Sequence, residues 1–181
     1  MTYQSAGATL PPMTITSSPV QATIRHELRP GDLGAVTAMQ GIEYGEQYAM
    51  DITFEADVAR GMGAFGRAIA EDPESGRMWI AEDGGQMVGS IAVTDEGDGL
   101  ARLRWFLVRR SARGQGLGRR LLDEAMAYIR ERGFERVELE TFSELTTAAR
   151  MYLDAGFEVV DAAPRLQWGR EIELRHYELK L

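Results

Sequence analysis

The chain has 181 residues and a formal net charge of −8 at pH 7. A protein this acidic repels phosphate, which argues against a broad surface for nucleic acid or an anionic membrane. The absence of cysteine from the sequence excludes disulfides, thiolate zinc sites and cysteine nucleophiles. The apolar fraction of 44% and the charged fraction of 27% are typical of a soluble globular protein, so we expect a cytoplasmic location.

Residues 1–21 are rich in Ser, Thr, Pro and Ala. They lack the basic start and the apolar block of a signal peptide, and we expect them to form a disordered arm. No later stretch has the roughly 18 apolar residues of a membrane helix. We therefore expect one domain over residues 22–181, with neither a membrane nor a nucleic acid as a partner.

The first half of this domain reads as one strand, two helices and three further strands. Ala22–Leu28 alternates weakly and predicts a strand. Asp32 is a candidate cap for a helix to about Tyr44, and a second helix is expected over Phe54–Glu71 after an acidic and aromatic connection. Three β-rich runs follow, the first two joined by a hairpin at Gly84–Gly85. The runs cover residues 77–83, 86–96 and 100–110.

The second half returns to helical spacing. Apolar residues at positions 121, 122, 125, 126 and 129 predict a helix over Arg119–Arg132. A strand over residues 135–141, a helix over Thr146–Ala155, a strand over residues 157–160, a loop over 161–169 and a final strand to Leu181 complete the chain. This order predicts an α/β (α+β) fold: a mixed, mostly antiparallel sheet of about seven strands with helices on both faces. The strands that flank the Arg119–Arg132 helix should be parallel.

A glycine-rich turn separates the third of these β-rich runs from this helix. The segment Arg113-Gly114-Gln115-Gly116-Leu117-Gly118 lets the backbone approach a ligand closely, and the helix start offers free N–H groups that suit a phosphate. Alternatively, it is a tight turn among solvated arginines, which are Arg109, Arg110, Arg113, Arg119 and Arg120. The sequence lacks the lysine of a Walker motif, and the glycine spacing differs from the dinucleotide pattern, so a nucleotide-binding switch is disfavoured.

The stretch VRRSARGQGLGRRLL resembles the acyl-CoA-binding signature of the GNAT N-acetyltransferase family, Arg/Gln-x-x-Gly-x-Gly/Ala, with Arg113, Gly116 and Gly118 at its fixed positions. ELTTAARMYLDAGFEVV resembles the second cofactor segment of the family and contains Tyr152. The resemblance covers residues 24–181. It is strongest to GNAT domains fused to MarR-type DNA-binding domains, although the arm of 21 residues is too short to hold such a domain.

The resemblance implies the GNAT fold and acetyl-CoA as cosubstrate, without a metal. The backbone of the strand before the turn would bind the pantetheine arm, and the amides of the turn would bind the pyrophosphate. The residues expected to bind the cofactor are Phe106, Leu107, Val108, Arg113, Gly114, Gln115, Gly116, Leu117, Gly118 and Arg119.

The resemblance also assigns Tyr152 as the general acid that protonates the leaving thiolate, whereas the alternative is a tyrosine packed in the core. For the general base we prefer Glu140 over Glu138, which shares its strand face. The alternative is that both glutamates face solvent or pair with Arg102 or Arg104. His26 and His176 are distant in sequence and form no recognisable metal site.

Acidic and aromatic residues between the first two helices, together with a tryptophan in the late loop, are candidates to bind a cationic amine; the alternative is an ordinary polar loop. These candidates are Glu43, Tyr44, Tyr48 and Trp168. We therefore expect an acyl-CoA-dependent N-acyltransferase, most simply an N-acetyltransferase, in which a primary amine of a small-molecule or amino-acid-like acceptor attacks acetyl-CoA directly in a ternary complex. Transfer of a longer acyl group and a non-catalytic acyl-CoA sensor are the alternatives. Dimers are common in the family, so a homodimer is also expected.

Overall fold

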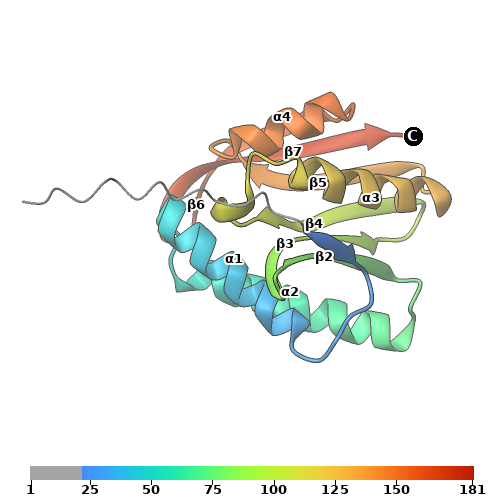
Figure 1. Ribbon diagram of the computed structural model, residues 1–181. Helices are drawn as coiled ribbons and strands as arrows, with labels where there is room; N and C mark the ends of the chain where they lie inside the picture. The colour runs from blue at the N-terminus through green and yellow to red at the C-terminus, as the bar shows by residue number, and fades with distance from the viewer. Residues whose placement is uncertain (1–21) are drawn as a thin grey trace, which may run out of the picture.

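The computed structural model describes residues 22–181, and the predicted arm over residues 1–21 lies outside them. One seven-stranded sheet runs through the molecule in the order β1-β2-β3-β4-β5-β7-β6. Helices α1 and α2 cover one face of this sheet, and α3 and α4 cover the other (Figure 1). The predicted fold class is confirmed. Within the described part of the chain, no helix is both long enough and apolar enough to cross a membrane.

All neighbouring strands are antiparallel except β4 and β5, which are parallel as predicted. The hairpin at Gly84–Gly85 is also confirmed, since β2 and β3 pair on either side of it. The strands are β1 Thr23–Arg25, β2 Gly76–Asp83, β3 Gln86–Asp95, β4 Leu100–Val108, β5 Arg136–Phe142, β6 Glu158–Gln167 and β7 Arg170–Lys180.

The helices follow the predicted order. They are α1 Asp32–Tyr48, α2 Ile52–Glu71, α3 Leu117–Glu131 and α4 Thr146–Asp154, with a 3₁₀ turn over Arg110–Ala112. The helical spacing that predicted α3 is confirmed, because the residues that carry it are all buried against the sheet.

Helix α1 departs from the prediction at both ends. Asp32 does not cap it: Gly31 is the N-cap residue, and the Asp32 carboxylate instead accepts hydrogen bonds from the Arg29 N–H at 2.6 Å and from the Arg25 guanidinium at 2.8 Å. The helix also continues to Tyr48, past the predicted end near Tyr44. The helix continues there because Tyr48, one turn after Tyr44, packs partly buried against the same core cluster.

The predicted loop over residues 161–169 is wrong, because β6 continues to Gln167. Gln167 pairs with Arg170, and the two residues between them, Trp168 and Gly169, both adopt left-handed conformations, with φ of 56° and 79°. Positive φ at both central positions is the mark of a tight type I′ hairpin turn. Strand β6 is the edge of the sheet and almost all of it is exposed, which explains why Pro164 is tolerated within it.

Strand β4 contains a β-bulge at Trp105. One residue of β3, Ile91, lies opposite two residues of β4, and Trp105 adopts a left-handed φ of 49°. The Ser90 hydroxyl stabilises this geometry by donating to the Trp105 carbonyl at 2.8 Å. The indole packs edge-on against Phe65 and lies over Gly61 of α2, where a Cβ would be only 2.9 Å from the ring. The bulge is therefore held both by a hydrogen bond and by close packing against α2.

Strands β4 and β5 separate before they reach this bulge. They pair only at Leu100, Ala101 and Arg102 of β4. Beyond Arg102, β4 continues beside β3 alone, and the edge that it turns toward β5 has no strand partner there. The separation opens the sheet between its two halves and positions the site described below.

Arg25 joins β1, α1 and β2 through a buried ion cluster. Its guanidinium, 11% exposed, lies 2.8 Å from Asp32 and 2.7 Å from Glu82. The hydrogen bonds from Arg25 lower the pKa of both carboxyls from their ordinary values of 3.8 and 4.5. A depressed carboxyl pKa contributes stability that is fully present above the ordinary value and is lost as the pH falls through the folded-state value.

We therefore expect Arg25→Met to lower the free energy of unfolding by about 3 kcal/mol at neutral pH, because it leaves the buried Asp32 carboxylate and the partly buried Glu82 carboxylate unpaired. Urea denaturation should show that this loss shrinks once the pH falls below the folded-state pKa values of Asp32 and Glu82. Arg175→Met, which breaks an exposed pair with Glu173, is the control and should cost less than about 1 kcal/mol. Equal losses in the two variants would contradict the role of the buried cluster.

Candidate functional site

Two cavities meet where β4 and β5 separate. The larger has a volume of 600 Å³ and extends along the end of β4 to the glycine turn and the start of α4. The smaller, of 260 Å³, lies between the separated strands, helices α1 and α2, and the turn between β6 and β7. Tyr44, Phe106 and Leu145 line both cavities, so a molecule bound in one would lie beside a molecule bound in the other.

The glycine turn forms one end of the larger cavity. Gly114 and Gly116 have φ of 80° and 76°, and Gly116 is the N-cap of α3. The first hydrogen bond of this helix runs from Arg120 N–H to Gly116 O, so the N–H groups of the first turn precede the intrahelical ladder. Since this turn contains no acidic side chain, the positive end of the helix dipole is available to an anion.

Arg113 braces the turn from within. Its Nε donates to Val108 O at 2.8 Å, and its Nη1 donates to the Gln47 side chain at 2.6 Å. Glu43 lies 3.5 Å from Arg113 Nη2 and also accepts a hydrogen bond from the backbone N–H of Arg110 at 3.2 Å. The buried Glu43 carboxylate thus ties α1 to the turn. We expected Glu43 to contact the acceptor; in the structure its side chain faces Arg113 and does not line the smaller cavity.

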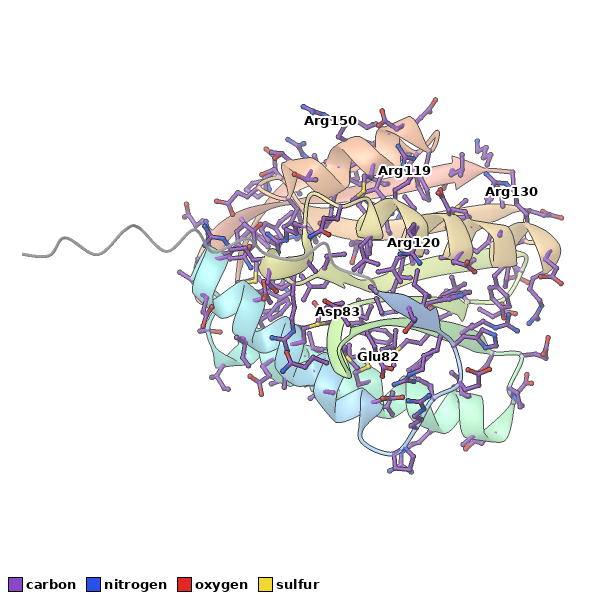
Figure 2. The ribbon with its side chains drawn as sticks, viewed as in Figure 1. Glu82, Asp83, Arg119, Arg120, Arg130 and Arg150 are labelled. Atoms are coloured by element: carbon purple, nitrogen blue, oxygen red, sulfur yellow. The ribbon has the colours of Figure 1, made fainter. Side chains whose placement is uncertain are left out.

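The five arginines near the turn do not act as one cationic patch. Arg113 and Arg119 line the larger cavity, whereas Arg109 donates to Met87 O and Arg120 donates to Ala22 O. Arg119 points toward α4, where it lies 3.4 Å from the exposed Asp154, and Arg120 points toward the start of β1 (Figure 2). The backbone of the turn is therefore the main feature that could bind an anion.

Tyr152 on α4 is buried and lines the smaller cavity. Its ring centroid lies 6.0 Å from that of Phe106, 5.9 Å from that of Phe157 and 5.7 Å from that of Tyr177. Burial raises the pKa of Tyr152 above its ordinary value of 10, and the neighbouring Tyr44 and Tyr177 raise it further. Tyr152 is both core-packed and cavity-lining, so the two sequence interpretations of this residue are compatible.

Tyr44 lies at the junction of the two cavities. Its ring stacks on that of Phe54 with centroids 4.7 Å apart. Burial raises the pKa of Tyr44 as well, with a smaller contribution from Tyr48. Tyr48, which we expected beside the acceptor, lines the larger cavity and not the smaller one. Both Tyr44 and Tyr152 carry their protons at neutral pH and can donate hydrogen bonds into the junction.

The two glutamates on β5 have different environments. Glu138 forms an ion pair with Arg102 and lies 3.3 Å from Nε2 of His176, which matches the alternative that it pairs with an arginine. Glu140 lines the smaller cavity with 52% of its side chain exposed, and His176 Nδ1 lies 3.9 Å away. The strand register, which pairs Glu140 with His176, brings these groups together, and this pairing was not predictable from their positions in the sequence.

Trp168, a predicted acceptor-binding residue, lines the smaller cavity. It stands at the turn between β6 and β7, where its indole N–H donates to Asp57 Oδ2 at 3.0 Å and its ring lies edge-on to Phe54. Asp57 and Gln40 also line this cavity, although neither was predicted as a site residue from the sequence. Asp57 adjoins Val58 on the apolar face of α2, and Gln40 adjoins Met39 on the buried face of α1, so a polar residue within an apolar face was the available signal.

Residues 22–181 contain no cluster of three or more His, Asp or Glu side chains that could hold a metal ion.

Comparison with known proteins gives one consistent result. Residues 43–157 match the profile of the Acetyltransferase (GNAT) family. An N-acetyltransferase from Schizosaccharomyces pombe is 31% identical over 124 residues, which cover 66% of this chain and 72% of the relative. N-acetyltransferase 8F1 from Rattus norvegicus is 32% identical over 110 residues, and these cover 58% of this chain but only half of the rat protein's length.

Solved structures share the fold. Ribosomal-protein-alanine N-acetyltransferase from Brucella melitensis superposes with a TM-score of 0.70 at 22% identity, covering 88% of this chain and 99% of that one. YncA from Salmonella typhimurium, solved with its cofactor acetyl-CoA, also superposes with a TM-score of 0.70, at 20% identity, covering 89% of this chain and 94% of that one. At these identities the likeness concerns the fold alone.

The positive φ of Gly116 in the glycine turn predicts that a substitution there lowers stability. Gly116→Ala should lower the free energy of unfolding by about 1–2 kcal/mol, because an L-residue is disfavoured at its positive φ. The matched control is Gly63→Ala within α2, where φ is not positive and the space is open. This change should raise the free energy of unfolding by about 0.5–1 kcal/mol. Urea denaturation measures both, and a stabilising effect of Gly116→Ala would contradict the observed turn.

Proposed function

Because the chain belongs to the Acetyltransferase (GNAT) family, we propose that it is an N-acetyltransferase. It transfers an acetyl group from acetyl-CoA to the primary amine of a small-molecule or amino-acid-like acceptor. The observation that carries this proposal is the meeting of two cavities at the separation of β4 and β5, with Tyr44 and Phe106 common to both. A cosubstrate in the larger cavity and an acceptor in the smaller one would place their reacting groups together.

The larger cavity fits acetyl-CoA in two respects. The turn that begins at Gly114 leads into the N-terminus of α3, which has no acidic residue in its first turn and suits a pyrophosphate. The part of β4 that contains Phe106, Leu107 and Val108 has lost β5 as a neighbour, so its backbone can pair with the extended pantetheine arm as a further strand would. Acetyl-CoA supplies a thioester, whose carbonyl carbon is attacked by the amine while the C–S bond breaks.

Tyr152 is the proposed general acid. Its buried side chain lines the smaller cavity beside Phe106, at the junction where the thioester would lie. The hydroxyl can donate to the sulfur as negative charge develops there. Since burial and the neighbouring tyrosines raise the pKa of Tyr152, the phenol holds its proton over the whole physiological pH range.

Glu140 is the proposed general base. It is the β5 glutamate that faces the smaller cavity without the arginine partner that Glu138 has. A carboxylate there can accept, through water, the proton that the amine must lose to become a nucleophile. His176, on the opposite side of Glu140, can help to hold this carboxylate in place. Because the sequence has no cysteine, direct attack by the amine is preferred over a cysteine acyl-enzyme.

Four further expectations remain predictions. They are a cytoplasmic location, a homodimer, a preference for acetyl over longer acyl groups, and a special similarity to GNAT domains that accompany MarR-type regulators. The long exposed edge of β6 supports the second of these, because an exposed edge strand can pair with another chain.

Binding of acetyl-CoA is the first test. Calorimetric titration should give selective binding of acetyl-CoA, with NAD and ATP as controls. Gly118→Leu should abolish this binding, because Gly118 lines the larger cavity and a leucine side chain there would occupy it. Gly63→Ala should bind as the wild type does. Failure of the wild-type protein to bind acetyl-CoA would sink the proposed function.

Removal of the Tyr152 hydroxyl tests the chemistry. Tyr152→Phe should lower kcat about 100-fold, the usual range for loss of a general acid, while the affinity for acetyl-CoA stays unchanged. Because the pKa of Tyr152 is raised, the wild-type rate should not fall between about pH 8 and about pH 10 through ionisation of this residue. An unchanged kcat in the variant would show that Tyr152 only packs in the core, whereas acetyl-CoA binding without any turnover by the wild-type protein would favour the non-catalytic acyl-CoA sensor.

A further inference from the structure

Among residues 22–181, three buried side-chain polar atoms have no hydrogen-bond partner: Gln40 Nε2, Ser75 Oγ and Arg102 Nε. Two of the three residues, Gln40 and Arg102, line the same smaller cavity. Buried polar atoms are nearly always paired, since leaving one unpaired is costly. Two unpaired N–H donors beside one cavity therefore point to a hydrogen-bond acceptor that a ligand supplies.

Gln40 contributes a neutral donor from α1. Its side chain is 3% exposed and lies one helical turn before Tyr44, on the face that α1 turns toward the sheet. A glutamine amide carries two N–H donors on Nε2, and each seeks an acceptor when water is excluded. The position thus keeps a strong donor at the wall of the cavity.

Arg102 contributes a charged donor from β4. One side of its guanidinium pairs with Glu138, while Nε stays without a partner. Arg104, the other arginine that lines this cavity, differs from Arg102 because its Nε donates to the Thr94 hydroxyl and its Nη2 donates to Glu96. Arg102 is thus the cavity-lining arginine whose buried Nε–H has no hydrogen-bond partner within the described protein.

The same cavity also carries the opposite charge. Asp57 and Glu140 line it, and the aromatic rings of Tyr44, Phe54 and Trp168 add apolar wall to the same cavity. A ligand that matches such a cavity has an ammonium group for the carboxylates, a carboxylate for the donors and an apolar side chain. Charge-assisted hydrogen bonds to Arg102 and Gln40 would fix its orientation.

We propose that the smaller cavity binds an α-amino acid as the acetyl acceptor and that Gln40 Nε2 and Arg102 Nε donate to its carboxylate. The inference rests on the proposed acetyltransferase function and specifies its acceptor. Gln40 and Arg102 act as specificity-determining residues, because they would favour amines that carry a carboxylate over those that lack one.

The test compares acceptors that differ only in this group. L-Phenylalanine, L-methionine and L-leucine are each assayed beside their carboxamides and their decarboxylated amines, with CoA thiol release as the measure of turnover. The best free acid should have a KM about 10- to 100-fold below that of its decarboxylated amine, as expected for hydrogen bonds to a charged group. For ligands without an indole, quenching of tryptophan fluorescence gives binding directly, because Trp105 and Trp168 line the cavity.

The Gln40→Leu variant tests whether Gln40 causes this preference for free acids over decarboxylated amines. It should raise the KM of the free acid about 10- to 100-fold and leave that of the decarboxylated amine unchanged. Because the change also removes a buried unpaired donor, the thermal unfolding midpoint should stay the same or rise, whereas a merely structural glutamine would lower it. Arg102→Lys keeps the charge but loses Nε, and it should show the same selectivity loss. Gln86→Leu, at an exposed position of β3, is the matched control.

The outcomes separate the two proposals. If decarboxylated amines are acetylated as efficiently as the free acids, or if Gln40→Leu affects all acceptors equally, the amino-acid inference is overturned while the acetyltransferase function stands. If acetyl-CoA binds but none of the free acids is acetylated, the amino-acid inference alone is overturned. If acetyl-CoA does not bind, the proposed function fails as well.

Discussion

The separation of β4 and β5 is the constraint on which the site depends. Pairing between them ends at Arg102 and Glu138, which are register partners and also an ion pair. Beyond that point the bulge at Trp105 changes the register of β4 against β3. Backbone N–H and C=O groups at the open edge must find partners other than β5. An extended ligand can supply them, so the break in the sheet creates the place for one.

The bulge is costly by itself, because a tryptophan rarely adopts a left-handed conformation. The bulge persists because the Ser90 hydroxyl donates a hydrogen bond to the Trp105 carbonyl and because the Trp105 ring fits over Gly61 of α2. Strained backbone of this kind tends to occur at functional sites, where the surrounding structure enforces it. Here the strain lies between the two cavities, and both helices and strands contribute to maintaining it.

Features that depend on local chain geometry were predictable from the sequence. The glycine turn, the apolar stripe of α3 and the hairpin at Gly84–Gly85 each follow from spacing or from a backbone requirement. The C-terminal end of α1 was not predictable in this way. Glu43 resembles a polar loop residue unless its tertiary partners, Arg110 and Arg113, are known. Its contacts with the turn are made across more than 60 residues of sequence, as the Arg110 contact at a separation of 67 illustrates. Burial of a carboxylate is acceptable only with such a partner.

Strand β6 escaped prediction for the opposite reason. Alternating hydrophobicity marks a strand that has one buried face, but β6 is an edge strand with little burial on either side. Its conformation is set by pairing with β7 and by the turn at Trp168 and Gly169. The smaller cavity likewise could not be predicted from the sequence, because the tertiary packing of α1, α2 and β5 brings together Gln40, Asp57 and Glu140.

The local charge arrangement explains how an acidic protein can hold an anion. Most arginines near the glycine turn bind backbone carbonyls or acidic side chains, as Arg109, Arg113 and Arg120 do. They shape the turn and leave the helix N-terminus as the main source of positive potential. A negative net charge therefore does not conflict with an anion at this position, because the attraction is short-ranged and built into the backbone.

Helix α1 contacts both cavities through residues that are adjacent in its sequence. Glu43 is bonded to the glycine turn at one cavity, while Gln40 and Tyr44 form part of the wall of the other. A ligand that displaced α1 from either side would therefore alter the surroundings of the second ligand. Thermodynamic linkage then requires reciprocity: whatever factor the first ligand imposes on the dissociation constant of the second, the second imposes on the first. A single helix would thus couple the binding of the two proposed ligands.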